Sequence, residues 1–227
     1  MKNMLMKLTN KIFLNNSLDG KGERVNIVYN GEFKYDRLDM YQKSHVKRYE
    51  FAKLSILSGK DVADFACGTG YGTIILSEKS YHVVGVDINP GVIIQLKKRY
   101  KKVANVEFIC SDLLHLDYQS YFDYIVSYET IEHLNEEDIP KLFSIFSRAL
   151  KPGGTIYFSV PYLQPRSPEA ISMGFHQTFN IDEEKIREWT TRNGLETKLM
   201  KYQNYQTHHV EDVLEHKDFI ICVANKT

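Results

Sequence analysis

The chain has 227 residues, of which 43% are hydrophobic, enough to fill one compact core. Lys and Arg together number 29, as do Asp and Glu, so the formal net charge is zero and no nucleic-acid partner is expected. The three cysteines are widely spaced, which disfavours a zinc knuckle, an iron–sulfur cluster or a disulfide framework and favours a cytoplasmic protein.

Residues 1–35 are predicted to form an N-terminal arm that is partly disordered or acts as a lid. The first 16 residues contain Lys2, Lys7 and Lys11 but no acid, and their apolar residues are interrupted too often for a signal peptide. We interpret them as a loose arm or a short docking helix. No membrane span is expected, because no run approaches the roughly 20 apolar residues that a bilayer requires.

From residue 43 onward, short β-branched runs alternate with longer helical patterns. Helices are predicted over 43–57, 71–78, 90–101, 136–150 and 182–192, and strands over 62–66, 82–86, 106–110, 124–127 and 155–160. This alternation implies βαβ units, and hence an α/β fold whose mainly parallel sheet has helices on both faces. Two last strands, 195–202 and 218–224, have no obvious helix between them and are predicted to pair antiparallel at the sheet edge. Residues 36–227 are thus expected to form one domain, with an insert near 161–181 and a loop near 203–217.

The densest motif is the sequence DFACGTGYG at residues 64–72, where the first predicted strand gives way to a helix. Ligands of open α/β sheets bind at the carboxyl ends of the strands. Gly68 and Gly70 permit a tight turn and the close approach of a bulky ligand. Asp64, at the strand end, can accept hydrogen bonds from an ammonium group, directly or through water. A glycine-rich turn alone is weak evidence, because NAD-dependent enzymes also use one.

Acidic residues also follow the next two strands. Asp87 lies 23 residues after Asp64, where a carboxylate can hold both hydroxyls of a ribose. Asp112 ends the third strand, where it can accept from an adenine amino group while Leu113 and Ile88 cover the ring. Asp64 or Asp112 alone could be a helix cap, but acids at three successive strand ends favour a binding site.

Five segments between Asp61 and Pro161 resemble class I methyltransferases that depend on S-adenosylmethionine (SAM), particularly those with the type 11 methyltransferase domain. The segments are DFACGTGYG, GVDINP, CSD, FDYIVSYETIEHL and LKPGGTIYFSVP. The resemblance implies a Rossmann-like, seven-stranded sheet and SAM as cofactor. One departure is Ala66, where the family usually has glycine. The cofactor-binding residues that it implies are Tyr41, Arg48, Asp64, Ala66, Gly68, Gly70, Asp87, Ile88, Ser111, Asp112, Leu113 and Tyr128.

Other classes of protein fit the sequence less well. Thr73 stands where a dinucleotide dehydrogenase has the third glycine of its fingerprint. A nucleotide triphosphatase is disfavoured because the chain has no GxxxxGK[ST] motif. A noncatalytic protein that kept the fold to bind a partner is disfavoured by the intact acids Asp64, Asp87 and Asp112.

A small-molecule acceptor is expected to lose a proton to a base, and two histidines are candidates. His133 follows the fourth strand, with Glu132 beside it to orient it, and His176 lies in the insert. The alternative for His133 is a role in structure or in packing against the cofactor, and the alternative for His176 is a loop histidine bonded to the backbone.

The segment at 39–52 resembles stretches in bacterial methyltransferases encoded with polysaccharide genes. This likeness favours a sugar or sugar-nucleotide hydroxyl as acceptor, with Arg48 or Arg166 meeting a diphosphate. The alternative is that both arginines are surface or ion-pair residues. N-methylation of an amino sugar or another small amine is the alternative. A homodimer is also considered.

No metal site is predicted. Several potential ligands fall in the loop before the last strand, but without a diagnostic spacing, and a solvated polar loop is favoured. They are His208, His209, Glu211, Asp212, Glu215 and His216.

Overall fold

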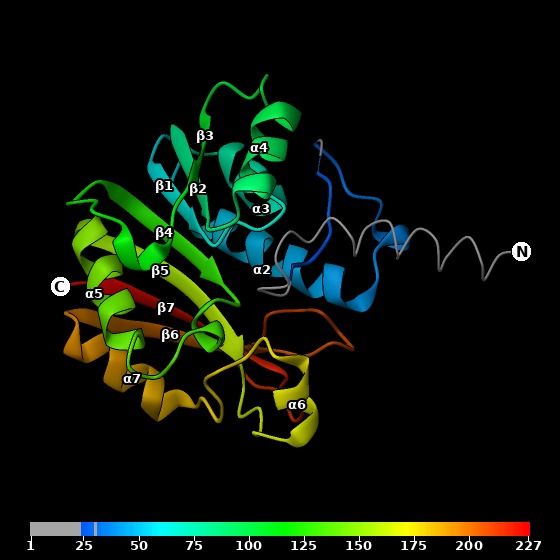
Figure 1. Cartoon of the computed structure of the whole chain (residues 1–227), viewed down its shortest axis with the longest axis vertical. Helices are drawn as coiled ribbons and strands as arrows, with labels where there is room; N and C mark the ends of the chain where they lie inside the picture. Colours follow the sequence, from blue (N-terminus) through cyan, green and yellow to red (C-terminus); the bar gives the residue numbers. More distant parts are fainter. Residues whose placement is uncertain (1–23, 30) are drawn as a thin grey trace, which may run out of the picture.

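The computed structural model describes residues 24–29 and 31–227, so the predicted arm or docking helix at residues 1–16 lies outside the described residues. Its centre is a seven-stranded sheet with the order β3-β2-β1-β4-β5-β7-β6 (Figure 1). The strands are β1 (Asp61–Phe65), β2 (His82–Asp87), β3 (Val106–Cys110), β4 (Phe122–Tyr128), β5 (Leu150–Pro161), β6 (Leu195–Gln203) and β7 (Phe219–Lys226). The first five strands pair in parallel, and β7 pairs antiparallel with both β5 and β6. The predicted fold class, including the antiparallel pair at the edge, is confirmed.

Helices cover both faces of this sheet. α2 (Met40–Ser55), α3 (Tyr71–Ser77) and α4 (Pro90–Arg99) pack on one face, and α5 (Ile139–Ala149) and α7 (Glu183–Arg192) pack on the other (Figure 1). Successive side chains of a strand point to opposite faces. Val62 and Val83 therefore belong to the first core, whereas Ala63 and Val84 belong to the second. Short 3-10 turns complete the described elements: η1 (Tyr35–Arg37), η2 (Leu113–His115) and η3 (Ile131–His133).

Several helix boundaries differ from the sequence prediction for identifiable reasons. α2 begins three residues early, because Asp39 and Gln42 form a reciprocal capping box. α5 begins only at Ile139, and Pro140 occupies its first turn, where a missing N–H is tolerated. β5 begins at Leu150, so the Pro-Gly-Gly segment at 152–154, which follows the helix predicted over 136–150, already belongs to the strand.

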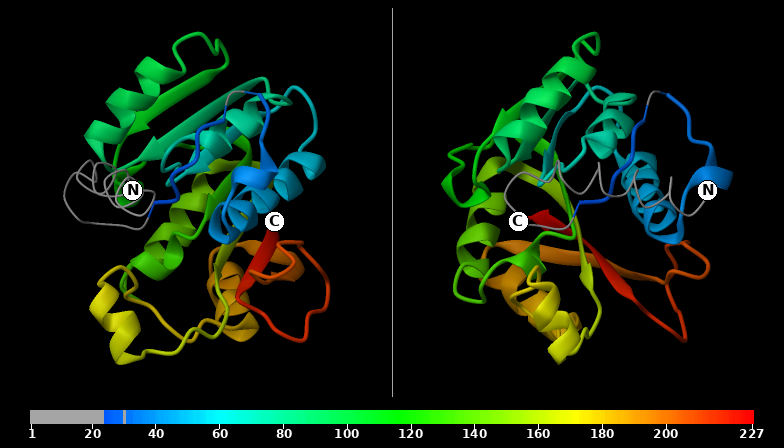
Figure 2. Two further views of the ribbon diagram at one scale, coloured as in Figure 1. Left: turned by 90° about the vertical axis from the view of Figure 1, so that its right-hand side faces the viewer. Right: turned by 45° about the vertical axis from the view of Figure 1, so that its right-hand side comes forward.

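One helix was not predicted. α6 (Pro168–Met173) lies in the segment after β5 and is capped by Ser167, whose hydroxyl accepts a hydrogen bond from the backbone N–H of Ala170. Figure 2 shows this segment projecting beyond the end of β5, away from α4. It is too short to give a clear helical period in the sequence. Across the described residues, none of the helices combines the length and the apolar character needed to cross a bilayer.

Candidate active site

A cavity of about 920 Å³ opens at the carboxyl ends of the parallel strands. It is bordered by the residues that follow β1 to β5, by α2 and by the loop between β6 and β7. This is the edge of an open α/β sheet at which ligands bind. Of the residues singled out in the sequence, the cavity is lined by Tyr41, Ala66, Gly68, Asp87, Ile88, Ser111, Asp112, Leu113, Tyr128, His133 and His176. Arg48, Asp64 and Gly70 are not part of its lining.

The turn after β1 forms one wall of this cavity. Ala66 and Gly68 both have left-handed backbone conformations, with φ of 63° and 52°. For alanine this conformation costs about 1 kcal/mol or more, which explains why glycine suits the position better. The turn is held by a hydrogen bond from Cys67 N to Val86 O of 2.8 Å. A Cβ built on Gly68 would meet no atom within 4 Å, so the space in front of the turn is open to a ligand.

Asp87 joins this turn to the end of β2. Its carboxylate accepts hydrogen bonds from the backbone N–H groups of Gly68, at 3.1 Å, and Asn89, at 2.8 Å. The guanidinium of Arg24 forms an ion pair with the same carboxylate at 2.8 Å. The Asp87 side chain is only 6% exposed. Asp87 is therefore a fixed negative charge at the cavity wall, with a cation from the N-terminal segment beside it.

The segment that contains Arg24 crosses the glycine-rich turn. The Thr69 hydroxyl lies within hydrogen-bond distance of the carbonyl oxygens of Val25, at 2.9 Å, and Ile27, at 3.2 Å. Arg24 and Val25 both border the cavity. Sequence reasoning missed this contact, because nothing in the spacing of these residues links them to a turn more than 40 positions away.

Asp64 lies behind the turn rather than at the cavity. It is fully buried and accepts hydrogen bonds from the hydroxyls of Tyr49, at 2.8 Å, and Thr73, at 2.6 Å. Burial raises the pKa of the Asp64 carboxyl to about 6, although the two hydroxyls oppose the shift. Asp64 thus ties α2 and α3 to the end of β1. It lies outside the cavity lining, and the ammonium contact expected from the sequence, direct or through water, stays a prediction.

The segment after β3 contributes Ser111, Asp112 and Leu113 to the cavity. One carboxylate oxygen of Asp112 caps η2 by accepting a hydrogen bond from Leu114 N at 2.9 Å. The cap that was considered as an alternative is thus present, and the same side chain, 37% exposed, also borders the cavity. Ile88, which follows β2, is 59% exposed and also borders the cavity.

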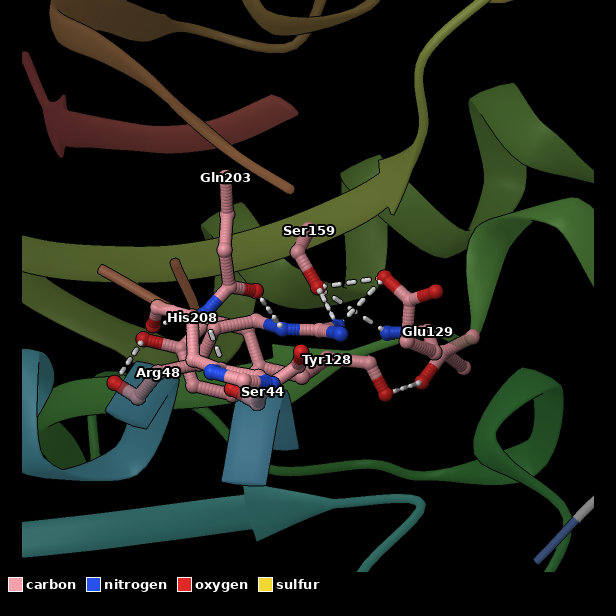
Figure 3. A network of polar contacts seen from close by, with 8 residues as sticks. Ser44, Arg48, Tyr128, Glu129, Ser159, Gln203 and His208 are labelled. Carbon is pink, nitrogen blue, oxygen red and sulfur yellow. Dashed lines mark hydrogen bonds and ion pairs between the residues drawn. The ribbon is translucent and has the colours of Figure 1, made fainter. Parts of the chain in front are cut away.

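Arg48 has the alternative role of an ion-pair residue. It was expected to bind the cofactor or a diphosphate, but its side chain is fully buried beside the sheet (Figure 3). Its guanidinium pairs with Glu129 at 2.7 Å and donates to the side-chain oxygens of Gln203, at 2.8 Å, and Ser159, at 3.0 Å. It also lies 4.2 Å from the centre of the Phe219 ring. Arg48 therefore joins α2 to the ends of β4, β5 and β6 instead of facing a ligand. Arg166, the other proposed diphosphate contact, is exposed outside the cavity lining.

Glu129 was not singled out in the sequence. It has a left-handed backbone with φ of 49°, its N–H donates to Ser159 O, and its side chain borders the cavity. A strained backbone at a non-glycine residue is common where a site fixes a side chain. Glu129 is the first residue of ETIEH in the segment FDYIVSYETIEHL, so the sequence contained a signal for it. Only its ion pair with the buried Arg48 shows why its side chain is held there.

α2 forms another wall. Tyr41, which is 48% exposed, packs against Tyr205 of the β6–β7 loop with 4.7 Å between ring centres. His45 also lines the cavity, and burial holds its imidazole pKa well below the usual value. Tyr128 lines the cavity from β4, and its hydroxyl donates to the backbone oxygen of Arg48 at 3.1 Å.

The two candidate bases meet at the far end of the cavity. The rings of His133 and His176 lie 5.1 Å apart at an angle of 71°. Nδ1 of His133 donates to the carbonyl oxygen of Phe175 at 2.9 Å, and Nδ1 of His176 lies 2.6 Å from Oε1 of Gln164. Burial, reinforced by the neighbouring His133, lowers the pKa of His176 to about 4. The sequence had not indicated that these two histidines come together.

Charged groups of the polar loop between β6 and β7 are paired with neighbouring protein groups. Lys201 pairs with Asp212 at 2.6 Å, and His216 lies 3.1 Å from Asp218. Within residues 24–29 and 31–227, the loop does not form a cluster with metal-binding geometry; the cluster that does consists of Glu132, His133 and His176.

The chain matches known proteins in its central part. Residues 62–154 match the model of a methyltransferase domain. Phosphoethanolamine N-methyltransferase 1 of Arabidopsis thaliana is 36% identical over 121 residues, which are 52% of this chain and 24% of that protein. Demethylmenaquinone methyltransferase of Staphylococcus saprophyticus is 29% identical over 157 residues, which are 65% of this chain and 66% of that protein. The chain spans about a quarter of the length of the plant relatives it matches.

Solved structures share the fold. The N-methyltransferase NodS of Bradyrhizobium japonicum, solved with S-adenosyl-L-homocysteine, aligns with a TM-score of 0.66 and 16% identity over 87% of this chain and 93% of its own. The cyclase SpnF aligns with a TM-score of 0.67 and 14% identity over 95% and 92%. The resemblance noted in the sequence is confirmed to this extent: residues 62–154 match a methyltransferase domain, and solved methyltransferases share the fold. Because a cyclase has the same fold, the reaction must be argued from the site.

Proposed function

We propose that this protein transfers a methyl group from SAM to a hydroxyl of a small molecule, a sugar or a sugar nucleotide. The observation that carries the proposal is the buried Asp87 carboxylate, fixed by Gly68 N and Asn89 N at the wall of a 920 Å³ cavity. SAM supplies a methyl group already activated on a sulfonium, so the protein mainly positions the acceptor and excludes water.

The residues at the turn fit an adenosyl group. Asp87 presents a negative charge to which two neighbouring ribose hydroxyls can donate. Gly68 leaves open space next to it. Ser111, Asp112 and Ile88 border the adjoining part of the cavity, where we place the adenine ring. Asp64 acts indirectly by holding the turn through Thr73.

The other end of the cavity suits a polar acceptor. His133 and His176 lie there with Gln164 and Lys217, and all four line the cavity. His133 donates through Nδ1, so its Nε2 is the basic nitrogen and serves as the group that assists loss of the acceptor proton. A hydroxyl needs this help because a neutral alcohol is a poor nucleophile.

N-methylation of an amino sugar or another small amine is the second candidate. The names of two similar proteins favour it, since both phosphoethanolamine N-methyltransferase and NodS are N-methyltransferases. An amine would use the same histidines to lose its proton. The two candidates differ in the acceptor atom, which a product analysis identifies directly.

The test has two stages. Calorimetry with the purified full chain should first show SAM binding at one site. Incubation with labelled SAM and a matched panel of nucleotide sugars and amino sugars should then give an O-methylated product. Absence of SAM binding would overturn the proposal, and label on nitrogen alone would replace it with the second candidate. His133→Ala should keep SAM binding but slow turnover, and unchanged turnover would remove His133 from this role.

Three further points stay predictions from the sequence: a single domain over residues 36–227, a cytoplasmic location and a homodimer. The role in polysaccharide biosynthesis depends on the acceptor and is part of the same proposal. Gel filtration of the purified chain tests the homodimer independently of the chemistry.

A further inference from the structure

Three potential metal ligands converge at the acceptor end of the cavity. Glu132 and His133 come from η3 after β4, and His176 comes from the segment after β5. One ligand atom from each lies within 4.8 Å of the other two. All three residues line the cavity, and Glu132 is only 1% exposed.

The hydrogen bonds of the two histidines select the nitrogen that can bind a metal. Phe175 O and Gln164 Oε1 are acceptors, so Nδ1 carries the proton in both His133 and His176. The lone pair of each neutral imidazole is therefore on Nε2. Metal-binding histidines are commonly held in this way, with the other ring nitrogen donating to a carbonyl oxygen.

The backbone holds the cluster together independently of these side chains. The carbonyl oxygen of Glu132 accepts from Gln177 N at 2.8 Å and from Thr178 N at 3.1 Å. The Thr178 hydroxyl donates to Leu134 O at 2.7 Å. These contacts fix the segment that carries His176 against η3, so the three side chains face one another in the folded protein.

We propose that Glu132, His133 and His176 bind one divalent transition-metal cation of the Zn²⁺ type. Two imidazoles and a carboxylate are donors that such cations take at about 2.0–2.2 Å, commonly with a further position left for water or substrate. Donor atoms around a tetrahedral ion are then about 3.4 Å apart, within reach of small side-chain rotations. Mg²⁺ prefers an oxygen shell and fits two imidazoles poorly.

The cation would deepen the proposed methyl transfer, on which this part of the inference rests. Its open position faces the cavity, where a hydroxyl of the acceptor can coordinate and become more acidic. The hydroxyl proton passes to solvent water, and an oxygen lone pair forms the bond to the methyl carbon. The electron pair of the broken carbon–sulfur bond stays on sulfur, so atoms and charge balance. His133 then assists the proton loss as a ligand of the cation.

Metal binding can be measured without SAM or acceptor. The purified full chain is stripped with a chelator, dialysed and titrated with Zn²⁺ alone by calorimetry, with Mg²⁺ in a parallel run. We expect one equivalent of Zn²⁺ to bind and Mg²⁺ to give no comparable isotherm. Glu132→Gln and His176→Gln should each weaken Zn²⁺ binding at least about tenfold.

Two further variants keep the test independent of folding. Gln164→Ala removes only the acceptor that holds His176 and lies on a partly exposed segment, so it should weaken Zn²⁺ binding about 10- to 100-fold in a folded protein. His209→Gln is the matched control, because His209 is exposed in the other histidine-rich segment. Its Zn²⁺ affinity should equal that of the unmodified chain.

The outcomes separate this inference from the proposed function. Absence of stoichiometric Zn²⁺ binding, or an equal loss in His209→Gln and His176→Gln, overturns the metal site even if SAM binds. Zn²⁺ binding that depends on the three residues in a chain that does not bind SAM supports the metal site and overturns the methyl transfer. Preference for Mg²⁺ over Zn²⁺ would contradict the assignment of two nitrogen donors.

Discussion

Replacing Arg48 by methionine should destabilise the protein more than any exposed charge substitution. Methionine keeps much of the apolar stem but removes the guanidinium, which leaves the Glu129 carboxylate, 14% exposed, without its 2.7 Å partner. Breaking a buried ion pair from one side costs about 3–5 kcal/mol. We expect about 3 kcal/mol, the lower end, because Glu129 keeps some contact with solvent and with the Ser159 hydroxyl.

The measurement is urea unfolding, supported by the melting temperature. At about 2–4 °C per kcal/mol for a chain of this size, Arg48→Met should melt about 6–12 °C lower. Lys47→Met is the matched control: it lies next to Arg48 on α2, and its ion pair with Glu50 is about one-third exposed, so it should cost less than about 1 kcal/mol. In the double variant with Glu129→Gln, the cycle should give a coupling of about 2 kcal/mol. A cost equal to that of Lys47→Met, or no coupling, would refute the reasoning.

Asp87→Asn should weaken SAM binding about 10- to 100-fold by calorimetry, because a neutral amide replaces a charge-assisted acceptor worth about 1.5–3 kcal/mol; an unchanged affinity would place the ribose elsewhere. Asp64→Asn should change the pH dependence of stability. The pKa of the Asp64 carboxyl is about 6 when folded, against an ordinary value of 3.8, so the folded state holds the extra proton between these values. The stability that this proton contributes is lost as pH rises through 6. The free energy of unfolding of the unmodified chain should therefore fall relative to Asp64→Asn by up to about 3 kcal/mol between pH 4 and pH 7, and parallel curves would contradict the raised pKa. Gly72→Ala should cost about 1–3 kcal/mol in urea unfolding, since its Cβ would lie 2.1 Å from the Tyr49 ring; no cost would mean that α2 and α3 separate easily.

The sheet could be predicted because its signals are local. Runs such as Val62–Ala66 and Val106–Cys110 are short, β-branched or aromatic and followed by turn residues, so their strands were located within one or two residues. The short α6 gives no such period, and the capping box at Asp39 moved the start of α2. Local patterns thus suffice for the order and type of the long elements but not for their ends.

The sequence predicted those residues of the site that directly follow the parallel strands. Asp87 and Asp112 border one cavity, as their positions after β2 and β3 required. The sequence could not distinguish a side chain at the cavity from one just behind it, and Asp64 and Arg48 are both behind. Their burial depends on packing between α2 and the far strands, which are separated by up to 155 residues along the chain.

The position of α2 also determines where this chain can be cut without losing buried contacts of the site. The segment that matches the methyltransferase domain begins at residue 62, whereas Tyr49 and Arg48 come before it. A fragment that starts there would keep Asp64 and Glu129 but lose the Tyr49 hydroxyl that donates to Asp64 and the Arg48 cation that pairs with Glu129. The family match therefore marks out a shorter stretch than the one that completes these buried contacts, and expression boundaries for this chain belong upstream of Asp39.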